Sequence, residues 1–348
     1  MAGAIAIAVG EGETWTPAPV REEDAVTTQP RLSAEPQPAA DLVRSVHVIG
    51  RDEEDPAEPW EQPASSDELT ELSTRRFERL PHRPANLGEV PEGALDDLRP
   101  VLGDLRLDQL FIIPRTTRMV GATAGAHWVV TPTEVLAVGS DRLAVWINDD
   151  DGPRIRATIP FSEVVAVSDR TILLYSRLEL VGRDASVVVR YNTVGRPEIR
   201  SLIEPVRAVA TPVAASTAPG TGADPDSLPH KWMALTRSGD VQPVGTVTMV
   251  VAPGELDSPK PILHSGMTVL TDRELIVATD PTPDVRMAQY GFDLLIVARE
   301  RLLGLAGNDA SLRVIVDAGP GRLELETSAH PSVVDAAVRV LGPIVGAR

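Results

Sequence analysis

Four arginines on neighbouring hydrophobic blocks are the residues of this sequence best suited to binding chemistry: Arg170, Arg177, Arg183 and Arg190. A guanidinium group holds a carboxylate or a phosphate through paired hydrogen bonds, so these arginines predict a site for an anionic ligand or an acidic protein partner. The chain's own acidic N-terminal segment is one such partner. A second interpretation is that the arginines face solvent and pair with four nearby acids. Those acids are Glu163, Asp169, Glu179 and Asp184.

Two tyrosines and two threonines complete the candidate residues. Tyr175 and Tyr191 lie close to the arginines in sequence and are expected to pack with them. Thr27 and Thr28 follow the acidic run Glu22-Glu23-Asp24, an arrangement that resembles the sites modified by bacterial Ser/Thr kinases. A phosphate there adds roughly 1.5 to 2 negative charges, which an arginine cluster can bind. The alternative is an unmodified acidic linker.

The sequence contains none of the patterns that usually mark an active site or a metal centre. Its six histidines are scattered without ligand spacing, and it has no cysteine. Neither a phosphate-binding Gly-x-x-x-x-Gly-Lys-Ser/Thr loop nor a Gly-x-Ser-x-Gly nucleophile motif occurs. The run Asp149-Asp-Asp-Gly152 lacks the rest of a calcium-binding loop and therefore predicts a hairpin turn. We expect a protein that is not an enzyme and that uses no metal or cofactor.

Composition and charge narrow the class of protein further. The chain has 348 residues, a formal net charge of −17 and a pI of about 4.8, which opposes general binding to nucleic acid. The charge is uneven, because residues 1–60 hold twelve acids and four arginines (net −8) whereas residues 153–200 hold eight arginines and five acids (net +3). A cysteine-free chain suits the reducing cytoplasm. No run approaches the ~20 apolar residues of a membrane helix.

Short β-strands are the elements that would position the arginines. Apolar blocks rich in β-branched residues, separated by turn residues, run from Thr131 to Tyr191 and predict a meander of strands. A helix with one apolar face follows over 196–206, and Pro205 within it predicts a kink or an early end. Ahead of the meander the sequence predicts two short helices and a buried strand, over 65–79, 91–99 and 109–114.

Residues 1–64 are expected to form a disordered acidic tail, because prolines recur among acids and small residues and apolar runs are short. One island, Leu42–Ile49, is apolar enough to form a strand or to dock on another part of the protein. The complete domain map has this tail over 1–64, short helices and a linker over 65–104, a folded unit over 105–209, a flexible linker over 210–228 and a second folded unit over 229–348.

The order of the elements returns near the C-terminus. Thr271-Asp-Arg-Glu274 repeats Thr131-Pro-Thr-Glu134 at the start of a strand. In the last helix, a proline and the apolar face behind it repeat those of the earlier helix at a constant offset of 134. We interpret the two units as an internal duplication. The remaining correspondences align Phe292 with Phe161, Arg301 with Arg177 and Pro331 with Pro197.

About seven short strands followed by one C-terminal helix, in each of two units, resemble the pleckstrin-homology-like (PH-like) domains of bacteria. The resemblance rests on this element order and on the Thr-x-x-Glu-hydrophobic pattern at Glu134 and Glu274, and it covers roughly 105–209 and 229–346. It implies a mainly β fold with some α-helix. In that fold each unit is a small antiparallel barrel closed by its C-terminal helix.

Members of this family mostly bind lipids, peptides or proteins and are rarely enzymes. The chain departs from the lipid-binding members, because it has only two lysines, Lys231 and Lys260, and no lysine-rich loop between the first two strands. We therefore expect a cytoplasmic scaffold that binds other proteins, for example through an exposed edge strand that accepts a peptide. The alternatives are a peripheral membrane or anionic-ligand binder that uses the arginines, and an enzyme with an unfamiliar site.

Overall fold

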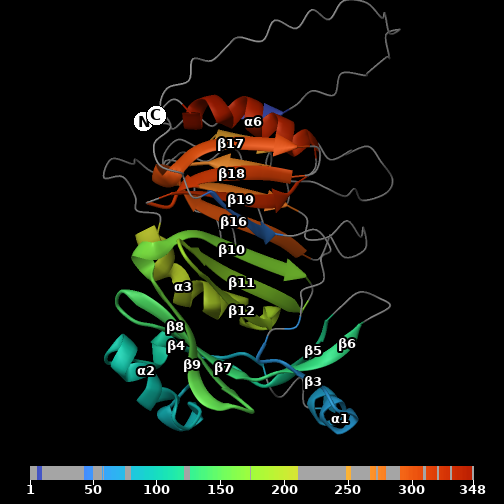
Figure 1. The fold of residues 1–348 in the computed structure, drawn as a ribbon, viewed down its shortest axis with the longest axis vertical. Helices are drawn as coiled ribbons and strands as arrows, with labels where there is room; N and C mark the ends of the chain where they lie inside the picture. Colours follow the sequence, from blue (N-terminus) through green and yellow to red (C-terminus); the bar gives the residue numbers. More distant parts are fainter. Residues whose placement is uncertain are drawn as a thin grey trace, which may run out of the picture.

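The computed structural model confirms a mainly β chain with a few helices (Figure 1). Among the residues that it describes, the strands form four sheets, and most neighbouring strands are antiparallel. The described residues are 6–9, 43–49, 57, 59–74, 80–120, 126–172, 174–210, 248–251, 267–271, 273–279, 291–308, 311–319, 321–329 and 331–346.

The first unit starts with an antiparallel sheet whose order is β4-β7-β8-β9, and three further strands and a helix follow it. The predicted hairpin turn between β8 and β9 is confirmed, with Asp149 opposite Gly152. Gly152 has a φ of 95°, which glycine adopts without steric cost. The elements are β4 (Leu110–Ile113), β7 (Thr133–Val138), β8 (Arg142–Asp149), β9 (Gly152–Pro160), η3 (Phe161–Glu163), β10 (Val164–Ile172), β11 (Tyr175–Gly182), β12 (Ser186–Asn192), η4 (Thr193–Gly195) and α3 (Arg196–Ala210).

The second unit shows the same order: four strands, a 3₁₀ turn, three strands and a helix. Three of the expected correspondences are wrong, and two of them concern the 3₁₀ turn. Phe161 lies in the 3₁₀ turn η3, whereas Phe292 lies in the fourth strand of its unit; Arg301 ends the equivalent 3₁₀ turn, whereas Arg177 lies in a strand. The apolar residues of these segments have similar spacing in the sequence, but the 3₁₀ turn begins at Phe161 in the first unit and at Arg299 in the second. The elements are β13 (Thr248–Val251), β14 (Met267–Leu270), β15 (Glu274–Thr279), β16 (Gly291–Ala298), η6 (Arg299–Arg301), β17 (Leu302–Asn308), β18 (Ser311–Asp317), β19 (Arg322–Ser328) and α6 (Pro331–Gly346).

The two units share one sheet. Strand β10 of the first unit pairs antiparallel with β16 of the second, and the sheet runs β1-β13-β14-β15-β16-β10-β11-β12. Figure 1 shows β16, β10, β11 and β12 following one another down the molecule. In the part of the chain that the structure describes, no sheet closes into a barrel, so the expectation of two barrels is wrong. The reason is that the edge strands β10 and β16 satisfy their backbone groups across the two units.

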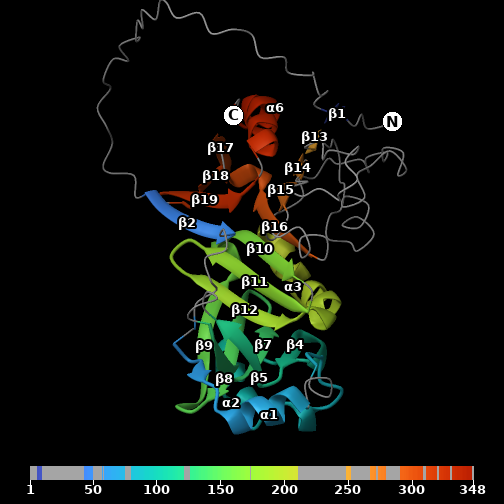
Figure 2. The ribbon, with the colours of Figure 1, turned by 90° about the vertical axis from the view of Figure 1, so that its right-hand side faces the viewer.

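Two segments of the N-terminal tail are strands. Strand β1 (Ala6–Val9) pairs parallel with β13, and β2 (Val43–Ile49) pairs parallel with β19 (Figure 2). The expectation of a tail without structure over 1–64 is wrong at these two places and also at β3 (Gln62–Pro63), which pairs with β6, and the strand at the apolar island 42–49 is confirmed. Both segments are apolar enough to add to an open sheet edge, unlike the acidic and proline-rich sequence around them. The expected linker 210–228 lies outside the described residues except for Ala210, which ends α3 and is therefore wrongly placed in the linker.

The segment before the first unit holds two helices and the strand β3, which pairs with a hairpin, β5–β6, inserted in the first unit between β4 and β7, and this small sheet has the order β3-β6-β5. The second helix was expected to end before Pro100 but continues to Leu102, because Leu98 and Leu102 on either side of the proline are buried. Helix α3 likewise passes its Pro205. Strand β5 was not predicted from the sequence. The elements are β3 (Gln62–Pro63), α1 (Ser66–Thr74), η1 (Leu87–Glu89), α2 (Ala94–Leu102), η2 (Leu107–Gln109), β5 (Thr116–Val120) and β6 (His127–Thr131).

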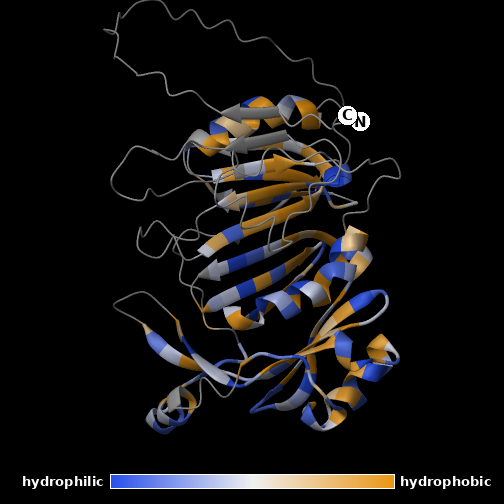
Figure 3. Cartoon of the chain, turned by 180° about the vertical axis from the view of Figure 1, so that it is seen from behind, coloured by the Kyte–Doolittle hydropathy of each residue, from blue (hydrophilic) through white to orange (hydrophobic). Residues whose placement is uncertain are grey.

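Each face of the shared sheet belongs to a different core. The face with Val167 and Leu294 packs against β4, β7, β8 and α3. The opposite face, with Ala166 and Leu295, packs against β17, β18, β19 and α6. Figure 3 shows hydrophobic residues concentrated along the stacked strands. Because successive residues of a strand point to opposite faces, the strands at the joint contribute to both cores at once.

Candidate functional site

Three of the four predicted arginines stand in one row across the strands of the first unit. Arg170 of β10 is directly opposite Arg177 of β11, which is directly opposite Arg190 of β12. Directly opposite residues project from the same face of a sheet, so these side chains share a face, and Tyr175 shares it with Arg177. The row continues into the second unit, where Asp293 of β16 lies opposite Arg170. Arg170, Arg177, Arg190 and Asp293 are the arginine row.

Carboxylates offset the positive charge of the arginine row. Like charges directly opposite on neighbouring strands destabilise a sheet, so such a row requires acids or an anionic ligand nearby. Arg170 Nε lies 3.6 Å from Asp293 Oδ1, and Arg177 Nη1 lies 3.0 Å from Glu179 Oε2. Burial raises the pKa of Glu179, and the neighbouring Arg177 opposes that rise. These ion pairs favour a structural role for the two arginines, and anion binding by the row stays a prediction.

Arg183 and Tyr191 lie away from the arginine row. Arg183 is in the turn between β11 and β12, and its guanidinium lies against Gly319 of the second unit, where a Cβ atom would come within 3.1 Å of its Cζ. Tyr191 follows Arg190 in β12 and therefore points to the opposite face, into the core. Its hydroxyl donates to Asp169 Oδ1 at 3.3 Å. The expectation that Tyr191 packs with the arginines is wrong.

Further arginines join the two units, and the sequence did not reveal them. Arg207 of α3 forms a buried ion pair with Glu274 of β15, with side chains 7% and 2% exposed. Arg196, at the start of α3, pairs with Asp169 at 2.7 Å and lies over the ring of Phe292 of β16 at 4.5 Å. Each arginine thus connects the helix of the first unit to a strand of the shared sheet. Their partners are far away in sequence, so only the fold brings them together.

The two Thr-x-x-Glu segments stand at different places in the two units, because Glu134 lies in β7, the second strand of its sheet, whereas Glu274 begins β15, the third strand of its unit. In the second unit, Thr271 Oγ1 accepts a hydrogen bond from the Glu274 amide at 2.9 Å and donates to the Glu274 carbonyl at 3.1 Å, which fixes the turn into β15. In the first unit, Glu134 of β7 pairs with Arg156 at 3.3 Å. Burial raises the pKa of Glu134, and Arg156 opposes the rise. Both glutamates are buried and paired with an arginine, but the expected correspondence of the two segments is wrong, because the turn at Thr271–Glu274 matches the turn at Gly139–Arg142 of the first unit.

The chain that leads into β3 fills a corner of the first unit, between β9 and the edge strand β12. Arg156 Nη2 donates to the carbonyl of Val188 in β12 at 2.7 Å, and the ring of Trp60 lies 4.3 Å from its guanidinium. The next residue, Glu61, accepts two hydrogen bonds from Arg118 at 2.7 and 2.5 Å, and both side chains are buried. Trp60 and Glu61 therefore anchor this segment to the first unit.

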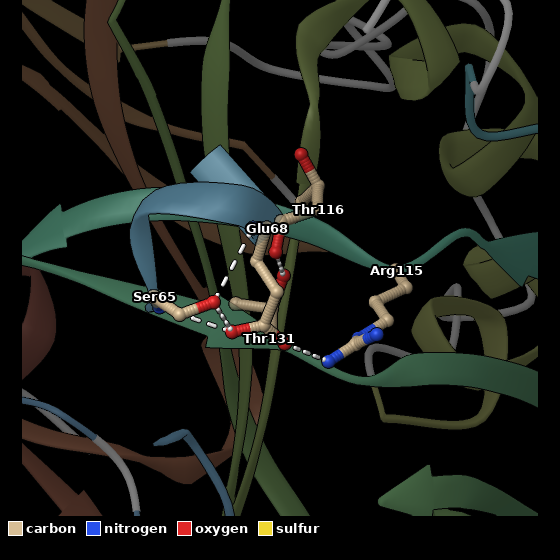
Figure 4. Close-up of polar contacts among 5 residues, drawn as sticks. All are labelled: Ser65, Glu68, Arg115, Thr116 and Thr131. Atoms are coloured by element: carbon tan, nitrogen blue, oxygen red, sulfur yellow. Dashed lines mark hydrogen bonds and ion pairs between the residues drawn. The ribbon is translucent and has the colours of Figure 1, made fainter. Parts of the chain in front are cut away.

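Helix α1 is fixed to the hairpin β5–β6 by polar contacts (Figure 4). Ser65 Oγ accepts from the Glu68 amide at 3.3 Å, and Glu68 Oε2 accepts from the Ser65 amide at 3.0 Å, which is a capping box. Glu68 also pairs with Arg115 at 2.5 Å. The Thr131 hydroxyl donates to the Thr116 carbonyl at 3.1 Å across the hairpin. These contacts confirm the predicted helix start at Ser65 and Ser66.

The same hairpin exposes two large apolar side chains. Met119 of β5 lies directly opposite Trp128 of β6, and the two residues are 60% and 45% exposed. Methionine and aromatic residues are enriched in protein interfaces. The pair is therefore compatible with contact to another protein.

Thr27 and Thr28 lie outside the described residues. Within the described residues, no group of three or more histidine or acidic side chains is placed to hold a metal ion. In the same part of the chain, no helix combines the length and apolar character needed to cross a membrane. Neither a protein-family model nor a curated protein matches this chain.

Proposed function

We propose that this protein is a non-enzymatic scaffold of the cytoplasm that binds other proteins by strand addition. Its two units are PH-like domains fused through β10 and β16, and partner segments add as extra strands to edges of the second unit. The observation that carries the proposal is that two segments of the tail pair in this way, β1 with β13 and β2 with β19.

The order of elements supports the PH-like assignment. Outside the β5–β6 hairpin, each unit has seven described strands followed by a C-terminal helix, which is the order that the resemblance implies. Fusion through two edge strands accounts for the absence of closed barrels among the described strands, because β10 and β16 pair with each other. The fused sheet also gives the two units a fixed relative orientation, which suits a scaffold.

Strand addition follows from the chemistry of a sheet edge. An edge strand carries a row of unpaired backbone N–H and C=O groups, and a peptide in extended conformation forms hydrogen bonds with them. Without the tail, β13 and β19 would be edges of the second unit. The parallel pairing of β1 and β2 there supports the view that these edges accept strands from outside the unit.

Affinity capture with full-length protein tests the proposal. The tail strands are released by Ala8→Pro and Val46→Pro, because proline lacks the N–H that pairs with the neighbouring strand. The control variant, Ala8→Gly with Val46→Ala, keeps both N–H groups. We expect proteins from the source cells to be recovered in larger amounts by the proline variant than by the control. Recovery of no specific protein by any variant would reject the scaffold.

The arginine row favours a second candidate function, the binding of an anionic ligand or membrane, because three guanidinium groups share one face. Arg170 and Arg177 already pair with carboxylates, and Arg190 interacts with Glu134 and Glu179, so the scaffold is the preferred function. Sedimentation with anionic liposomes at low and high salt tests the alternative. Binding at low salt that Arg177→Ala and Arg190→Ala abolish would support it, and no binding at low salt would remove it.

A further inference from the structure

Strand β2 covers the edge of β19 from Arg322 to Thr327. The parallel register runs from Val43 opposite Arg322 to Ile49 opposite Thr327, with one irregularity between Glu326 and Thr327. Strand β2 also lies beside β10 and β16 (Figure 2). It therefore fills the space between the sheet β17-β18-β19 and the joint of the two units. The three other strands of this sheet pair antiparallel with one another, whereas β2 comes from the N-terminal tail and pairs parallel.

The side chains of β19 give this edge a recognisable chemistry. Leu325 is buried in the core of the second unit, and the register places Val46 beside it. Glu326 is half-buried on the other face, where its Oε1 accepts from Ser311 Oγ at 2.5 Å, and His47 is the residue beside it in β2. Opposite charges side by side on neighbouring strands contribute roughly 0.2 to 1 kcal/mol. An added strand is thus favoured by an apolar residue beside Leu325 and by a basic residue beside Glu326.

At a third position of β19, a buried hydroxyl group lacks a hydrogen-bond partner. Thr327 is fully buried, and its hydroxyl has no hydrogen-bond partner. The register places Ile49 beside it, and isoleucine has no polar side-chain atom to offer. A buried hydroxyl without a partner is unfavourable, and a serine or threonine in place of isoleucine would relieve it. Strand β2 is therefore not the best sequence for the edge that it occupies.

We propose that the edge of β19 is a groove for an extended segment of a partner protein, and that β2 occupies it when the partner is absent. This inference rests on the proposed scaffold function and names its ligand class. The partner segment runs parallel to β19. It carries an apolar residue at the position of Val46, lysine or arginine at that of His47, and serine or threonine at that of Ile49. A second copy of this chain would supply only β2 again, with the Thr327 hydroxyl still unpaired.

The test uses full-length protein with Ser45→Cys and Glu324→Cys, which are side by side in the register. Neighbouring strands are close enough for a disulfide, and because the chain has no cysteine of its own, oxidation joins only these two positions within a molecule. The oxidised protein holds β2 on β19, and the reduced form of the same protein is its matched control. A second variant, Val46→Pro, empties the edge.

The probes are fluorescein-labelled peptides of residues 41–51, measured by fluorescence anisotropy. One peptide has the native sequence, one carries His47→Lys with Ile49→Thr, and one carries His47→Glu. We expect the Lys/Thr peptide to bind the reduced protein about tenfold more tightly than the native peptide, and the Glu peptide to bind least. Binding to the oxidised protein should be at least about tenfold weaker, and binding to the proline variant stronger, because β2 no longer competes.

Equal binding to oxidised and reduced protein would overturn the inference, as would a preference for the Glu peptide or no binding to reduced protein. If circular dichroism shows that the proline variant does not fold, the comparison of peptide binding to oxidised and reduced protein still tests the inference. A mixture of the two single-cysteine variants that forms disulfide-linked dimers would assign the edge to a second copy of the chain. If cellular partners are captured but the disulfide does not block them, the scaffold stands and only this groove is rejected.

Discussion

Replacing Arg207 by methionine is expected to destabilise the protein far more than the same change on its surface. Arg207 lies on α3 and Glu274 on β15, so their ion pair connects the first unit to the second. The two side chains are buried, and Arg207 Nε lies 3.3 Å from Glu274 Oε2. Methionine keeps most of the apolar stem of arginine but leaves the Glu274 carboxylate buried without its cation.

The magnitude follows from that burial. Breaking a buried ion pair by removing one partner costs about 3 to 5 kcal/mol, because the remaining charge is cut off from water. Removing both charges, with Arg207→Met and Glu274→Leu together, should restore most of the loss, since no buried charge remains. The control is Arg106→Met: Arg106 is 76% exposed and pairs with Asp108. Loss of a surface pair costs less than about 1 kcal/mol.

Urea denaturation followed by circular dichroism measures these free energies of unfolding. Tryptophan fluorescence adds a second probe. Trp60, Trp128 and Trp146 belong to the first unit or the segment before it, and a Trp232→Phe background removes the tryptophan of the expected second unit from the signal. If the ion pair couples the units, the two probes should report different midpoints in Arg207→Met and the same midpoint in wild type. A loss no larger than that of the surface variant would refute the reasoning, as would a double variant no more stable than the single one.

Three further predictions concern other described contacts. Burial raises the pKa of Glu179 above its ordinary 4.5, so the stability that its protonated form contributes is present below about pH 4.5 and is lost as the pH rises through the folded-state pKa. Urea denaturation from about pH 4 to 8 should show wild type losing stability relative to Glu179→Gln; parallel curves would contradict this. Trp60→Leu removes the stacking on Arg156 and should lower the free energy of unfolding by about 1 kcal/mol in thermal unfolding, and an unchanged curve would count against it. Ser65→Ala removes the cap bonded to Glu68 and should weaken α1 by about 1 kcal/mol, seen as faster amide exchange in α1 alone.

The sequence predicted the features that local chemistry decides. β-branched blocks became strands, the glycine at 152 made the expected turn, and the apolar face of the helix over 196–206 is buried, including Ile199 and Val206. The cap at Ser65 is another local feature. The register that aligns Arg170, Arg177 and Arg190 follows from consecutive strands and short turns, so a shared face could be expected from the chain order alone.

What the sequence did not predict depends on contacts between distant segments. Nothing near β10 or β16 indicates that these two strands pair, because their apolar residues suit either a closed unit or a fused sheet. Proline at 100 and 205 was expected to end or bend helices, but the buried residues beyond each proline, Leu102 and Val206, hold the helices together. The arginine partners Asp293 and Glu274 were missed for the same reason.

The pairing of β10 with β16 is a heterologous contact, in which two different surfaces meet. It pairs the strand that follows the 3₁₀ turn of the first unit with the strand that precedes the 3₁₀ turn of the second unit. The two paired surfaces therefore differ, so the same contact can repeat from unit to unit without closing. For the same contact to form between two molecules, β17 of one molecule would pair with β9 of the next. Strand β9 contains Pro153 and Pro160, which lack an N–H, and α6 packs on β17, with Val334 against Gly307. These two edge strands thus carry features that oppose growth into a fibre, and substitutions that remove these features would favour polymerisation.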